Sequence, residues 1–77
     1  MTDEQIVYIT ELVFRNWSDK ASSLLIVRGE RNDGSPDWSK FHDQRLENAE
    51  HAERQARDAR DAWQMENREA LRRQMGI

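Results

Sequence analysis

The chain of 77 residues holds no cysteine, and its 12 basic and 15 acidic residues give a net charge of −3 at pH 7. This length allows one domain with a small core, the lack of cysteine excludes disulfides and thiolate metal sites, and the near-even charge does not favour a dedicated nucleic-acid binder. No apolar run approaches the roughly 18 residues of a membrane span, and the acidic start is the reverse of a signal peptide, so we expect a cytoplasmic protein outside the membrane.

The first predicted element is a helix over residues 3–28. Thr2 and Gln5 have the spacing of a capping box, and the apolar residues that follow recur at gaps of three and four, which is typical of one helical face. Gly29 stands where a left-handed glycine ends a helix. The apolar run at 24–27 also suits a strand, but it has no second strand to pair with, so a helix is favoured.

A turn and a second, longer helix follow. Residues 29–35, GERNDGS, are typical of a turn because Asn, Asp and Gly tolerate positive φ. Ser35 and Pro36 then have the order of an N-cap and a first helical residue. No glycine or proline interrupts the chain after that until Gly76, so the second helix is predicted over 36–75.

The second helix carries small residues at regular intervals, and we interpret them as its packing face. Gaps of three and four are typical of a coiled-coil seam, and a short turn makes two helices antiparallel neighbours. Large residues of the first helix would then face small ones of the second. The predicted stripe consists of Trp38, Phe41, Ala49, Ala52, Ala56, Ala59 and Trp63. Counting outward from the turn pairs Leu24 with Phe41, Trp17 with Ala49, Val13 with Ala52, Ile9 with Ala56 and Ile6 with Ala59.

The apolar arc of the first helix is wider than this stripe covers. Val7, Phe14 and Leu25 lie about 80–100° from its centre, which indicates a second neighbour. The predicted fold is therefore all-α: a single domain, 1–77, that forms an antiparallel helical hairpin and dimerises into a four-helix bundle. The three residues would form the subunit contact.

The histidines are weak candidates for chemistry. His42 and His51 are nine residues apart, about 180° around a helix, so they cannot bind one metal ion together. The Glu-x-x-His pair of di-iron bundles is absent, since Glu47 precedes His51 by four residues. We expect both histidines on a solvated face, and we expect no metal, no cofactor and no enzymatic activity.

The arginines of the second helix have acidic partners at helical spacing. A glutamate four residues before an arginine stabilises a helix, so this face is expected to neutralise itself. The pairs are Glu50–Arg54, Glu53–Arg57 and Glu69–Arg73. Arg45 differs, since it falls within the apolar stripe, where it would either lie over the core or contact a partner carboxylate.

A chain with no active site is expected to act by binding a protein, as an adaptor or a stoichiometric inhibitor. Small accessory proteins of bacteria and phages fit this description. Apolar residues on the far side of the first helix and a mixed basic and apolar overhang, 64–77, are the candidate surfaces. The alternative is a small nucleic-acid-associated regulator that uses the basic end of the second helix. The candidate protein-binding residues are Tyr8, Leu12, Ile26, Arg68, Leu71, Arg72 and Met75.

Overall fold

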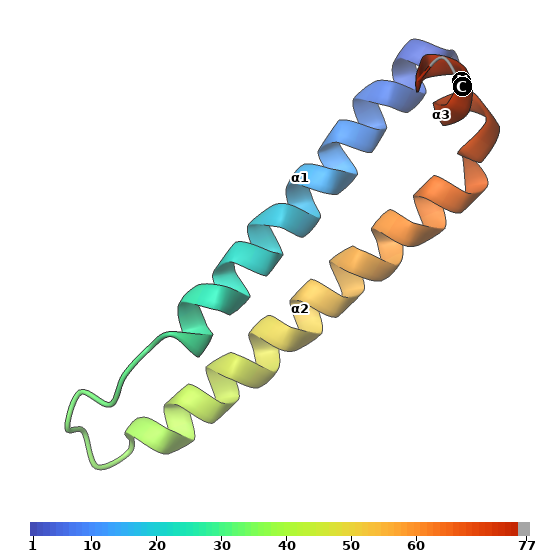
Figure 1. Cartoon of the computed structure of the whole chain (residues 1–77). Helices are drawn as coiled ribbons and strands as arrows, with labels where there is room; N and C mark the ends of the chain where they lie inside the picture. Colours follow the sequence, from blue (N-terminus) through green and yellow to red (C-terminus); the bar gives the residue numbers. More distant parts are fainter. Residues whose placement is uncertain (76–77) are drawn as a thin grey trace.

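The computed structural model describes residues 1–75, except the side chain of Met75. Its helices are α1 (Asp3–Arg28), α2 (Trp38–Glu66) and α3 (Arg68–Met75), which give a helix content of 84% with no strand in the described part of the chain. α1 and α2 run antiparallel along a rod of 55 × 18 × 15 Å, and α3 turns back at the end where α1 begins (Figure 1). The predictions of an all-α fold and of two long helices that pack together are confirmed.

The ends of α1 follow from local sequence. The Thr2 hydroxyl accepts from the backbone N–H of Gln5 at 3.2 Å, and the Gln5 side chain accepts from the Thr2 N–H at 2.9 Å, which completes the predicted capping box. α1 ends before Gly29, but this glycine has a φ of −84° and is not left-handed as predicted. Its N–H continues the helical pattern by donating to the Leu25 carbonyl, and positive φ occurs instead at Gly34.

The connection between α1 and α2 is longer than the predicted turn and spans residues 29–37. Inside it, the carboxamide of Asn32 and the carboxylate of Asp33 each accept a backbone N–H two residues ahead at 2.8 Å, so the polar side chains hold the loop. Pro36 lies in a turn rather than at the first position of the helix. α2 therefore begins two residues later than expected, and its N-cap, Asp37, makes no side-chain capping bond.

The predicted helix over 36–75 is interrupted at Asn67. This residue has φ −112° and ψ 22°, and both its backbone N–H and its side-chain amide donate to the Trp63 carbonyl at 3.0 Å. α2 ends at this non-helical residue, and α3 turns back, where it contacts α1 and buries Ala70. The segment 64–77 is thus not an overhang: its described residues belong to the end of α2 and to a packed α3.

The register of α1 against α2 also differs from the prediction. The indole N–H of Trp17 donates to Glu53, one helical turn beyond the Ala49 expected beside it. The Trp63 indole N–H donates to the Thr10 hydroxyl at 2.7 Å. The prediction instead places Ala56, two helical turns earlier in α2, beside the neighbouring Ile9. Counting outward from a tight turn failed because the loop is longer than a turn and α2 begins farther along the rod (Figure 1).

The face of α2 that packs on α1 is rotated away from the predicted alanine stripe. Ala56 is buried as expected, and four more members of the stripe are half-buried: Trp38, Ala49, Ala52 and Trp63. Ala59 and Phe41, however, are exposed. Glu53 and Arg60 turn inward instead, because aromatic residues of α1 offer them partners. The observed seam follows alternating gaps of four and three, and each of its members is buried or half-buried: His42, Leu46, Ala49, Glu53, Ala56, Arg60, Trp63, Asn67 and Ala70.

The apolar core of the hairpin is small. It consists of Ile6, Leu24, Val27, Ala56 and Ala70, and no side chain of the described residues is fully buried. In residues 1–75, none of the helices combines the length and apolar character that a membrane crossing requires. The rest of the contact between α1 and α2 is made by half-buried residues, which include polar ones such as Glu53 and Arg60.

Candidate protein-binding site

One side of α1 has no neighbour among the residues that the structure describes, and we call it the outer face of α1. Tyr8, Leu12 and Ile26 lie there with exposed fractions of 63%, 43% and 67%. At about 100° per residue they fall within roughly 40° of one another, on the side turned away from α2. The outer face consists of Tyr8, Leu12, Arg15, Asp19, Ser22 and Ile26, all exposed.

The apolar groups of the outer face form two separate contact points. Tyr8 and Leu12 are one helical turn apart and adjoin, whereas Ile26 lies about 21 Å farther along the axis from Leu12. Arg15 and Asp19 occupy the interval and present opposite charges. The structure thus keeps three of the predicted residues on one face, with two of them adjacent.

The predicted residues of α3 are not part of this face. Arg68 and Arg72 are exposed and Leu71 is half-buried, while the side chain of Met75 lies outside the described residues. α3 docks near Asp3, which lies about 140° around α1 from Tyr8, so α3 leaves the outer face uncovered.

An ion pair holds α3 against the start of α1. The Arg73 guanidinium donates to the Asp3 carboxylate at 3.2 Å, and this hydrogen bond, with the attraction between the charges, lowers the pKa of Asp3 below its ordinary value. Arg73 was expected to pair with Glu69 on its own helix. The turn at Asn67 brings Arg73 to Asp3 instead.

Polar groups inside the hairpin fix the orientation of α1 relative to α2. The Arg60 guanidinium lies over the rings of Trp17 and Phe14, with 4.3 Å and 5.9 Å to their centroids. Glu53 accepts from Trp17 and lies 3.8 Å from Arg57, which confirms the predicted Glu53–Arg57 pair. The sequence predicts Glu53 and Arg60 on the charged face of the second helix, and the spacing of that helix alone gives no signal for their inward position, because their partners lie in α1.

Glu50 also departs from the pairing expected within α2. Its carboxylate lies 3.8 Å from Arg28 at the end of α1, so this ion pair links the two long helices. The pairing of Glu50 with Arg54 rested on spacing within one helix. The neighbouring helix supplies another arginine on the same side.

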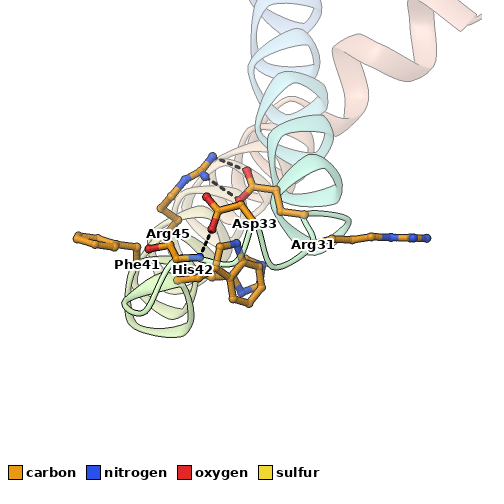
Figure 2. Close-up of a pocket in the computed structure, with 8 residues that line it drawn as sticks. Arg31, Asp33, Phe41, His42 and Arg45 are labelled. Carbon is orange, nitrogen blue, oxygen red and sulfur yellow. Dashed lines mark hydrogen bonds and ion pairs between the residues drawn. The ribbon is translucent and has the colours of Figure 1, made fainter.

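A cleft of about 320 Å³ lies at the loop end of the hairpin (Figure 2). Trp38 stacks on His42 with 4.4 Å between ring centroids, and the His42 Nε2 lies 2.9 Å from the Val27 carbonyl. His42 is therefore half-buried and bonded, not solvated as expected, whereas His51 is exposed as predicted.

One ion pair joins two of the charged groups that line this cleft. Arg45 donates to the Glu30 carboxylate of the same chain at 2.7 Å, so this arginine has an acceptor within the hairpin. Figure 2 shows Arg31 and Phe41 pointing away from the cleft in opposite directions. Among residues 1–75, no three His, Asp or Glu side chains are grouped to hold a metal ion. The outer face of α1 is the more extended surface for a macromolecule.

Comparison with protein-family models, with curated protein sequences and with solved structures finds no significant match to this chain.

Proposed function

We propose that the chain is a non-enzymatic protein-binding module that acts as an adaptor or a stoichiometric inhibitor by occupying a surface of a protein partner. The observation that carries the proposal is the outer face of α1, where Tyr8, Leu12 and Ile26 remain exposed although the chain is rich in polar residues. We place the module in the cytoplasm, among small accessory proteins of the kind that bacteria and phages encode.

The chemistry of this face suits a groove on a folded partner. Apolar side chains one turn apart on a helix are the anchors by which helices bind hydrophobic grooves, and Tyr8 and Leu12 have that spacing. Tyrosine is enriched among the residues that dominate binding energy at interfaces. Arg15 and Asp19 would lie at the rim, where charges contribute to specificity more than to affinity.

The alternative function, a nucleic-acid-associated regulator, would use the basic residues of α3. Arg68 and Arg72 are exposed, but Arg73 is paired with Asp3. Arg68 and Arg72 alone would make few contacts with a phosphate backbone. Binding through such contacts depends steeply on salt concentration. A salt titration with DNA and RNA separates this alternative from the proposal, which predicts no salt-dependent binding of either.

Capture of partners from the source cells by immobilised protein, with identification by mass spectrometry, tests the proposal. Leu12→Asp should abolish capture of the specific partner. Met65→Asp is the matched control, since Met65 is 80% exposed on α2 and away from the outer face. Circular dichroism checks that both variants are folded. Equal capture by the two variants would exclude the outer face as the binding site.

A further inference from the structure

We propose that a second copy of this chain docks on the flank of α1, a surface distinct from the outer face and defined by Val7, Phe14, Ala21 and Leu25. These residues lie within about 40° of one another around α1, and about 60–100° from the centre of its packing face. Val7, Phe14 and Ala21 are half-buried, and Leu25 is 67% exposed. The hairpin therefore covers this apolar line only in part.

The exposed area of the chain is large enough to form an interface with a second copy. The structure exposes 6128 Å², whereas a folded monomer of 9.2 kDa is expected to expose about 4,900 Å². The excess is about 1,200 Å² per chain, so two copies that buried it would form an interface of about 2,400 Å². Obligate homodimers bury roughly 2,000–5,000 Å² in total.

The charges beside the flank explain why it should meet α1 of the second copy rather than α2. The neighbouring side of α2 carries the ion-paired residues Glu50, Glu53 and Arg57, which do not match an apolar line. The flank itself is an apolar match for a second α1. A twofold axis makes such a contact self-complementary.

An antiparallel contact between the two α1 helices gives this line large-against-small packing. If the axis passes near residues 16–18, Phe14 of each copy lies opposite Ser18 and Ala21 of the other. Glu11 of one copy then lies beside Ala21 of the other, in a hollow that Arg57 also lines. At this edge of the contact, Glu11 would add a carboxylate near Arg28 and Arg57, each of which already lies 3.8 Å from a glutamate of α2.

Two adjacent residues provide a matched test of the flank. Leu25 and Ile26 are both 67% exposed, but they lie about 100° apart on α1, so only Leu25 is on the flank. Sedimentation velocity over the micromolar range should show a dimer for the wild type and for Ile26→Glu, and a folded monomer for Leu25→Glu. A wild type that stays monomeric throughout, or equal behaviour of the two variants, would overturn the proposal.

Cysteine cross-linking tests the same contact without disturbing the apolar residues. The chain has no cysteine, and Ser18 and Ser23 are both exposed on α1. Ser18→Cys, near the twofold axis, should form a disulfide-linked dimer on mild oxidation, whereas Ser23→Cys, about 140° away, should not. Cross-linking only through Ser23→Cys would place the second copy on another side of α1.

The tests of the dimer and of the proposed function give separate results. Ile26→Glu alters the outer face and should weaken partner capture while the dimer persists. Leu25→Glu alters the flank and should dissociate the dimer. If the wild type is a monomer and Leu12→Asp still abolishes partner capture, only the dimer proposal is wrong. If the wild type is a dimer and Leu12→Asp leaves capture unchanged, only the proposed function is wrong.

Discussion

The guanidinium of Arg60 lies 4.3 Å from the centre of the Trp17 ring, inside the hairpin and with only 20% of its side chain exposed. A cation over an indole face is favourable, and more so when it is partly desolvated. Because α1 and α2 share few fully buried apolar residues, contacts of this kind contribute to which sides of the two helices face each other. The outer face of α1 lies on the side of that helix opposite Trp17.

Removing the Trp17 ring should destabilise the hairpin. Trp17→Ala is expected to lower the free energy of unfolding by about 2–3 kcal/mol, less than the roughly 3–5 kcal/mol for a fully buried aromatic residue, because Trp17 is half-buried. Urea unfolding followed by circular dichroism measures the change. A loss below that of an ordinary surface substitution would mean that the Arg60–Trp17 contact does not hold the helices together.

Charge reversal should distinguish the inner from the outer charges of α2. Glu53 has 15% of its side chain exposed and accepts from Trp17, so Glu53→Lys removes that acceptor and places a cation beside Arg57 and Arg60. We expect a loss of about 1–3 kcal/mol in unfolding free energy. Asp58→Lys, at an exposed position, should change it by less than about 1 kcal/mol. Equal effects in thermal melts would contradict the inward position of Glu53.

Two alanines provide a test of close packing. Ala56 is buried between the helices and Ala59 is exposed. Ala56→Leu should therefore destabilise the protein by about 1–3 kcal/mol through overpacking, while Ala59→Leu should be nearly neutral. If Ala59→Leu is the more damaging, the alanine stripe predicted from sequence faces α1 after all.

The docking of α3 should weaken in acid. Arg73 lowers the pKa of Asp3 in the folded state, so the stabilisation is complete above the ordinary aspartate pKa of about 3.9 and is lost as the pH falls through the lowered value. The amide resonance of Ala70, followed by NMR during acidification, reports the change. Asp3→Asn should remove this dependence, and an identical titration of Ala70 in the variant would rule out the ion pair as its cause.

Local features of the fold could be predicted from sequence, and its long-range pairing could not. The Thr2–Gln5 capping box and the extent of α1 depend on residues a few positions apart. The register depends on the length and path of the loop, which the turn residues alone do not determine. The choice between the alanine stripe and the seam with Glu53 and Arg60 depends on partners in α1. A charged side chain is stable between the helices only where a group such as Trp17 interacts with it.

The break at Asn67 and the candidate site also depend in part on long-range contacts that the sequence does not predict. Asn67 suits both a helix and a helix end, and the contact of α3 with α1 decides between them. The exposure of Tyr8, Leu12 and Ile26 could be predicted because it depends on the angle from one packing face of α1. The place of α3 could not, and so its basic residues were grouped with a projecting segment.

Side-chain methyl NMR of the chain with its captured partner tests the central claim most directly. Binding through the outer face predicts that the methyl signals of Leu12 and Ile26 shift on addition of the partner, while those of Leu25 and Met65 stay in place. The close contrast is between Leu25 and Ile26, which are adjacent in sequence and equally exposed. Shifts confined to Leu25 or Met65, with Leu12 and Ile26 unchanged, would contradict the account.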